Sequence, residues 1–124
     1  MSVVYTDAGA PASASEIRAV CDELGLAHHA WLATFWAQRN GAMLNDRVQI
    51  YATDFIAERN QTYEVGSNFP EHVSIGDDSG GRLILMPISG DMSFHLIGAG
   101  DPFIEDADVF TSIEALLAYI ETES

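Results

Sequence analysis

The stretch Asp78-Ser79-Gly80-Gly81 contains the residues most readily associated with chemistry. This order is close to the sequence around the nucleophile of chymotrypsin-like serine proteases. A serine hydroxyl attacks a substrate only when a nearby base takes its proton and a third group orients that base. The first question is therefore whether the chain supplies a base for Ser79.

The chain has four histidines, and their surroundings indicate structural roles. His28 and His29 stand at the start of an expected helix with no catalytic motif around them, and His95 alternates with apolar neighbours in an expected strand. Gly, Asp and Ser tolerate turn conformations, so the residues around Ser79 suit a turn between two strands. We predict that Ser79 lies in a turn and is not a nucleophile.

Other patterns argue against metal and cofactor chemistry. Cys21, His28 and His29 lack a zinc-ligand spacing, and the chain has no second cysteine. The segment DPFIEDAD (101–108) offers carboxylates but neither the spacing nor the glycine of an EF-hand. GAGDPF (98–103) begins like a dinucleotide-binding loop but lacks its third glycine. We expect no cofactor, no metal and no enzymatic activity.

Charge is the strongest feature of the composition. Nineteen Asp and Glu residues face five Arg and no Lys, which gives a formal net charge of −14. Such a surface repels nucleic acid and anionic lipid and attracts basic partners. A requirement for solubility, or adaptation to a salty cytoplasm, would explain the same composition. Composition alone does not decide between these explanations.

Length and patterning predict one domain, 1–124, with a loose lead-in over 1–14. Hydrophobic residues make up 48% of the chain, enough for a core without a disulfide or a metal. The single cysteine, Cys21, is expected to be a buried free thiol. The N-terminus lacks signal-peptide features and no apolar run is long enough to span a membrane, so we expect a cytoplasmic location.

Two capping boxes predict the first and last helices. Ser13 and Glu16 open the first helix, which should end at Gly25, and Thr111 and Glu114 open the last. The last helix presents one apolar face, formed by Ile113, Leu116, Leu117 and Ile120.

The middle of the chain predicts two more helices and then strands. One helix is expected over 28–39. Another, capped by Thr53 and Asp54, should run to about residue 61 and bury Phe55 and Ile56. Helices grouped apart from strands indicate an α+β fold with a largely antiparallel sheet. The expected strands are 47–51, 72–75, 82–88 and 93–97, with a hairpin at 89–91.

Several segments resemble the SMI1/KNR4, or SUKH, superfamily. The similarity covers roughly residues 16 to 121. Its most specific part is a strand ending in Gly76, followed by an acidic glycine-rich turn and an apolar strand. The segments are LGL (24–26), WLATFW with RNGA (39–42), ERNQTYEV (58–65), FPEHVSIGDDSGGRLILM (69–86) and GDPFIEDADVFTSIEALLAYI (100–120).

This resemblance implies a SUKH-like α+β fold with N-terminal helices, a central, mostly antiparallel sheet, and a C-terminal helix packed on the sheet. It also implies a function without catalysis. Many bacterial members are immunity proteins that bind and neutralise polymorphic toxins, often nucleases, encoded beside them. Others regulate cellular processes through protein contacts. We expect a cognate toxin as partner, no nucleic acid or membrane partner, and a monomer or weak homodimer.

An acidic inhibitor can cover the basic surface with which a nuclease holds nucleic acid. Acidic side chains at strand ends and in loops can project from a rigid scaffold to make such contacts. There are two alternatives. One is a regulatory interaction module with a cellular partner, and the other is a small hydrolase or ligand-binding domain that uses the acidic loops. The expected partner contacts are Glu71, Asp77, Asp78, Asp101, Glu105, Asp106 and Asp108.

Overall fold

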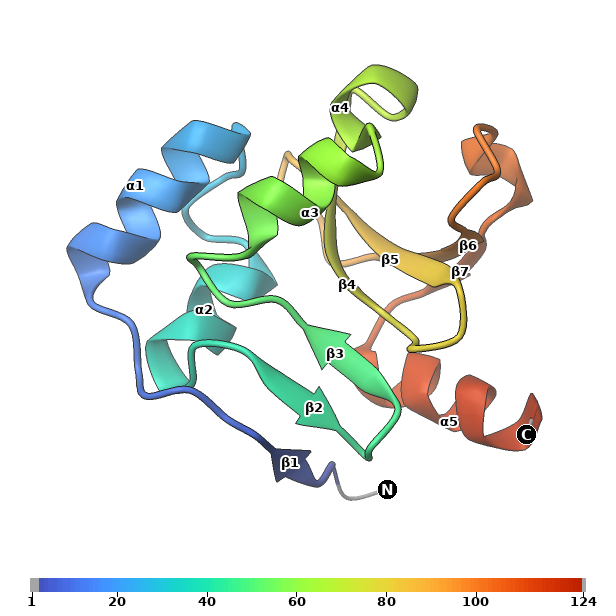
Figure 1. Ribbon diagram of the computed structural model, residues 1–124, viewed down its shortest axis with the longest axis horizontal. Coiled ribbons are helices and arrows are strands. Elements are labelled where there is room, and N and C mark those ends of the chain that lie inside the picture. The colour runs from blue at the N-terminus through green and yellow to red at the C-terminus, as the bar shows by residue number, and fades with distance from the viewer. Residues whose placement is uncertain (1–2, 124) are drawn as a thin grey trace.

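The computed structural model describes residues 3–123 and shows an α+β fold built on one antiparallel sheet (Figure 1). Within these residues the sheet has seven strands in the order β1-β2-β3-β4-β5-β6-β7, and each strand pairs with the next. The strands are β1 Tyr5–Thr6, β2 Ala42–Leu44, β3 Val48–Ile50, β4 His72–Asp77, β5 Arg82–Pro87, β6 Phe94–Gly98 and β7 Asp108–Phe110.

The helices lie at both ends of the sheet region and at its centre. Figure 1 shows α1 and α2 at one end of the molecule and α5 at the other, beside the C-terminus. The predicted α+β class, with N-terminal helices, an antiparallel sheet and a C-terminal helix, is confirmed. The helices are α1 Ala14–Leu24, α2 Trp31–Gln38, α3 Ile56–Thr62, α4 Val65–Asn68, the short 3-10 helix η1 Ile104–Asp106, and α5 Ile113–Glu123.

Helix α1 begins and ends where the sequence predicts. The backbone N–H of Glu16 donates to the Ser13 hydroxyl over 3.1 Å, and Gly25 ends the helix in the left-handed conformation with φ of 72°. In a capping box the Glu16 carboxylate would also accept a hydrogen bond from the backbone N–H of Ser13, and this part of the prediction is wrong. The Glu16 carboxylate instead accepts a hydrogen bond of 2.7 Å from the hydroxyl of Thr53. Glu16 therefore joins α1 to the segment that precedes α3.

Helices α2 and α3 begin later than predicted. Helix α2 begins at Trp31, because His28 and His29 lie in a turn. Thr53 and Asp54 do not cap α3, which begins at Ile56 without a side-chain cap. Ile56 is fully buried, as predicted. Phe55 was also predicted to be buried, and this is wrong, because it is 38% exposed.

Helix α5 is capped one residue later than predicted. The Ser112 hydroxyl accepts a hydrogen bond of 3.1 Å from the backbone N–H of Ala115. The predicted cap by Thr111 and Glu114 is therefore wrong, because Ser112 occupies the position that can reach the first turn. The predicted apolar face is confirmed, and its buried members are Ile113, Leu116, Leu117 and Ile120.

The four predicted strands are confirmed as β3, β4, β5 and β6, but three short strands were missed. Strands β1, β2 and β7 have only two or three residues each, too few for an alternating pattern to be visible. Strand β1 includes Tyr5 and Thr6 from the predicted lead-in, and these residues pair with Leu44 and Met43 of β2.

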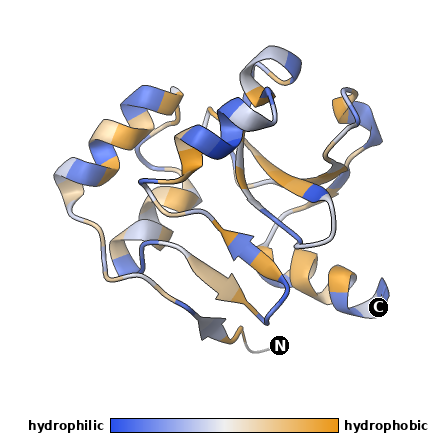
Figure 2. Ribbon diagram, in the orientation of Figure 1, coloured by the Kyte–Doolittle hydropathy of each residue, from blue (hydrophilic) through white to orange (hydrophobic). Residues whose placement is uncertain are grey.

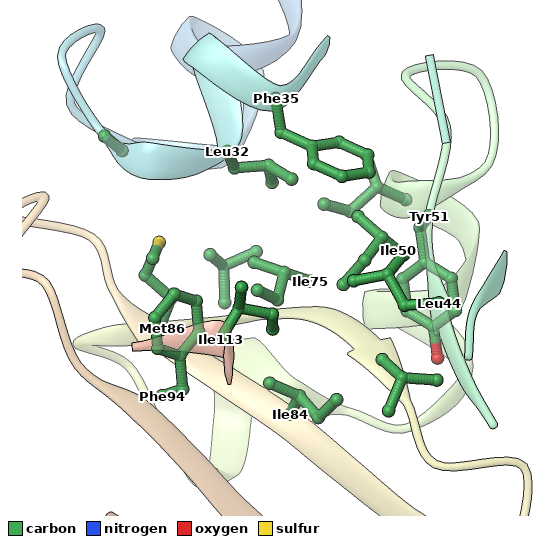
Figure 3. Packing of buried hydrophobic residues seen from close by; sticks show 14 of the residues in the cluster. Leu32, Phe35, Leu44, Ile50, Tyr51, Ile75, Ile84, Met86, Phe94 and Ile113 are labelled. Atoms are coloured by element: carbon green, nitrogen blue, oxygen red, sulfur yellow. The ribbon is translucent and has the colours of Figure 1, made fainter. Parts of the chain in front are cut away.

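The main hydrophobic core lies between one face of the sheet and helices α1, α2 and α5. Figure 3 shows Leu32 and Phe35 of α2 pointing toward side chains of the sheet, among them Ile50 and Ile75. Cys21 of α1 is fully buried here, so the predicted buried free thiol is confirmed. Burial, with a smaller effect of the neighbouring acid, raises the pKa of this thiol.

A smaller hydrophobic cluster covers the opposite face of the sheet. Leu83, Leu85 and Ile97 pack there against α4 and the segment around η1. Successive side chains of a strand point to opposite faces, so Ile84 and Met86 enter the main core instead. Strand β5 is therefore hydrophobic along most of its length, as Figure 2 shows. This second face carries the candidate site.

Candidate partner-binding groove

The residues around Ser79 form the turn between β4 and β5. The Asp78 side chain is 4% exposed, and its carboxylate accepts hydrogen bonds from the backbone N–H groups of Gly80 and Arg82. The Arg82 guanidinium pairs with the same carboxylate at 2.6 Å. Burial acts to raise the pKa of Asp78, but the hydrogen bonds from Arg82 and Gly80 outweigh it and hold that pKa below its usual value. The predicted turn is confirmed, with exposed Ser79 at φ of 62°.

Asp77 is also engaged within the fold. Its carboxylate accepts a hydrogen bond of 2.8 Å from the Tyr51 hydroxyl and one of 3.0 Å from the backbone N–H of Ser79. Burial, reinforced by the bond to Asp77, raises the pKa of Tyr51. The side chains of Asp77 and Asp78 therefore both bond within the fold and hold the turn between β4 and β5 together.

Asp108 lies apart from the other acidic residues. It opens β7 opposite Leu96 of β6, and Leu96 belongs to the main core. Side chains of directly paired residues lie on the same face of a sheet, so Asp108 is on the α5 side. There its carboxylate accepts a hydrogen bond of 3.2 Å from the Tyr119 hydroxyl of α5. Asp108 therefore does not join the acids on the second face.

Glu71 and Glu105 come together across an open groove of about 520 Å³. The groove lies between the α4–β4 connection and the start of η1, and we call it the acidic groove. Both glutamates are exposed, and within residues 3–123 neither carboxylate accepts a hydrogen bond. Phe103, which lines the same groove, is 58% exposed. The groove is lined by Asn68, Phe69, Pro70, Glu71, His72, Pro102, Phe103, Ile104 and Glu105.

Asp101 and Asp106 add negative charge beside the acidic groove. The Asp101 carboxylate accepts a hydrogen bond of 2.9 Å from the backbone N–H of Phe103, which lines the groove. A hydrogen bond between the Asp101 and Asp106 carboxyls, repulsion between their charges and the nearby charge of Glu105 together raise the pKa of Asp106. A cation bound here would relieve that repulsion.

Two histidines pack against each other where His72 lines the acidic groove. His72 lines the groove, and its ring meets the ring of His95 edge to face, with centroids 5.0 Å apart. The Ser93 hydroxyl lies 3.0 Å from Nε2 of His95. Burial lowers the pKa of both imidazoles, so both favour the neutral form. His95 is a packed histidine, as the sequence predicts.

Of the residues that line the groove, Glu71 and Glu105 are predicted from the sequence as partner contacts, but Phe103 and His72 are not. A signal for Phe103 was present, because it is the one aromatic residue within the acidic segment 101–108. His72 carried no such signal, since its place beside Phe103 depends on the path of the chain after β6.

Metal-ligand groups and membrane-spanning helices were sought among residues 3–123. Residues 3–123 contain no group of three or more His, Cys, Asp or Glu side chains placed to hold a metal ion. None of their helices is both long enough and apolar enough to cross a bilayer. Comparison with models of protein families gives no match, and comparison with curated proteins gives none either.

Proposed function

We propose that this protein is a SUKH-type immunity protein that binds and neutralises a cognate basic toxin, a nuclease, through protein–protein contact and without catalysis. The observation that carries the proposal is the acidic groove, where the exposed carboxylates of Glu71 and Glu105 accept no hydrogen bond from residues 3–123 and line the same surface as the exposed Phe103. A protein interface needs such an apolar anchor, and acidic neighbours select a basic partner.

The net charge of the chain supports a basic partner. With −14 overall, the field of the whole protein draws a basic surface toward it and raises the association rate. Nuclease toxins need basic surfaces because they hold a polyanion. An acidic protein that covers such a surface excludes the substrate by occupying its site.

The superfamily assignment is supported by the order of elements. N-terminal helices, an antiparallel sheet and a C-terminal helix are what the resemblance implies. The most specific resembling segment corresponds to β4, the acidic turn at 77–81 and the apolar strand β5. Within the turn, the acids have structural roles, which leaves the acidic groove as the surface for partner contact.

A pull-down from the native cell lysate, followed by mass spectrometry, tests the proposed function. The bait is the full chain, compared with a double variant that carries Glu71→Lys and Glu105→Lys. The control variant carries Glu23→Lys and Asp54→Lys, which makes the same change in net charge at exposed residues of α1 and of the loop before α3. We expect a basic nuclease domain to be retained by the wild type and the control but lost by the groove variant.

The captured toxin is then purified and assayed for nuclease activity with and without the immunity protein. An equimolar amount of the wild-type chain should abolish the activity. Recovery of only housekeeping proteins would contradict the toxin proposal and favour a regulatory interaction module. Equal loss of the toxin by both charge variants would show that net charge, and not the acidic groove, determines binding.

A further inference from the structure

The acidic groove combines two kinds of surface that suit different parts of one ligand. Its walls are apolar and include Pro70, Pro102 and Phe103, together with the buried Phe69. Its rim is acidic, with the free carboxylates of Glu71 and Glu105. An apolar side chain fits the walls, while basic groups on either side of it fit the rim.

Phe103 is exposed although the residues that follow it are packed. Ile104 and Ala107 contact the second hydrophobic cluster, so the loop is anchored on the sheet. The 3-10 helix η1 and the hydrogen bond from the N–H of Phe103 to Asp101 fix the backbone around the ring. A rigidly held aromatic side chain loses little conformational freedom on binding, which makes it a suitable anchor.

Charge determines which occupant the groove accepts. A second copy of this chain also carries a charge of −14, so repulsion opposes self-association at this surface. The carboxyls of Asp101 and Asp106, next to Phe103, repel each other and gain from a nearby cation. His72, which lines the groove, favours its neutral form, and a guanidinium can stack on neutral aromatic rings.

Building on the proposed function, we propose that the acidic groove docks a basic segment of the toxin in which an apolar side chain lies between two Arg or Lys residues. The apolar side chain packs against Phe103 between the two walls. The basic residues pair with Glu71 on one rim and with Glu105 and Asp101 on the other. The toxin is thus recognised by a short sequence pattern as well as by its net charge.

An NMR titration of the full ¹⁵N-labelled chain tests this docking mode without the toxin. The probe is the peptide Ac-Arg-Leu-Arg-Phe-Arg-NH2, and the matched control is Ac-Arg-Ser-Arg-Ser-Arg-NH2, which has the same charge. We expect the probe to shift the backbone amide signals of the groove residues that carry an N–H, which are Asn68, Phe69, Glu71, His72, Phe103, Ile104 and Glu105. The control should bind at least about tenfold more weakly, the loss typical of removing an anchor.

Two variants separate the apolar contact from the charge contact. Phe103→Ser should weaken the probe about tenfold and leave the control peptide unchanged, because Phe103 is exposed and its loss spares the core. Glu71→Gln with Glu105→Gln should weaken both peptides. Equal affinity for the two peptides, shifts spread over the surface, or no shifts at millimolar peptide would each overturn the docking mode.

The two proposals fail in different ways. Capture of a toxin that depends on Glu71 and Glu105, together with a negative peptide titration, would keep the immunity function and reject the short docking segment. A positive titration, with only housekeeping proteins captured from the lysate, would keep the groove as a basic-segment site and reject the toxin.

Discussion

The imidazole rings of His72 and His95 pack edge to face with their centroids 5.0 Å apart, and within residues 3–123 Nδ1 of His95 is buried without a hydrogen-bond partner. The negative charge of Glu71 acts to raise the pKa of His72, whereas the charge of His72 acts to lower the pKa of His95. Burial outweighs the effect of Glu71, so the folded protein holds both pKa values below the ordinary value of 6.5.

This pair predicts that the protein loses stability in mild acid. The unfolded chain takes up protons that the folded chain does not, so the free energy of unfolding is fully retained above pH 6.5 and falls as the pH drops from there toward the lowered pKa values. Urea unfolding at about pH 7.5 and about pH 5.5, on either side of the ordinary histidine pKa, measures the loss. His95→Gln should reduce it. His29→Gln, at an exposed residue, should not, and equal losses in all three proteins would contradict the prediction.

Asp78→Ala should destabilise the fold although it removes one acid from a strongly acidic chain. Two backbone N–H groups and the Arg82 guanidinium lose their acceptor, which corresponds to about 2–3 kcal/mol for hydrogen bonds to a charged group. Urea unfolding at neutral pH measures the change. Asp54→Ala, at an exposed acid, is the control and should stay within about 0.5 kcal/mol of the wild type. If Asp78→Ala were as stable as this control, the turn would not depend on its carboxylate.

Gly76→Ala should loosen the contact between β3 and β4. A Cβ at this position would overlap the carbonyl oxygen of Gln49 on the neighbouring strand. Overpacking of this kind costs roughly 1–3 kcal/mol, and here the clashing atom belongs to the backbone, which cannot rotate away. Thermal and urea unfolding measure the cost. Gly100→Ala provides the comparison, since a Cβ there meets open space, and a similar cost in both variants would argue against the close approach.

Thr53→Val should weaken the attachment of α1 to the rest of the fold. Thr53 is 5% exposed, and its hydroxyl donates to Glu16 over 2.7 Å and accepts from the Asn40 side-chain amide over 2.9 Å. Valine has a similar shape but can make neither bond, so the free energy of unfolding should fall by about 1–2 kcal/mol. Faster hydrogen exchange of the α1 amides would accompany it. Thr34→Val, at an exposed site on α2, should change neither quantity.

Sequence alone determined the features that depend on a residue's near neighbours. Ser13 caps α1 and Gly25 ends it, because a cap needs only a side chain and backbone within one turn. The turn at Asp78 and Ser79 follows from the same local preferences. The apolar run at 82–88 predicted a strand, which is β5, and the structure adds that a hydrophobic cluster lies on each of its faces.

Only the tertiary structure decided which side chains are free to act. Glu71 and Glu105 are distant in sequence and meet because the loop after β6 crosses the second face of the sheet. Asp78 has the same side chain type as the other loop acids, but Arg82 and two backbone N–H groups engage it. Composition cannot separate a buried acid from an exposed one. Contacts between distant segments make that distinction, and in this protein they leave Glu71 and Glu105 free beside Phe103.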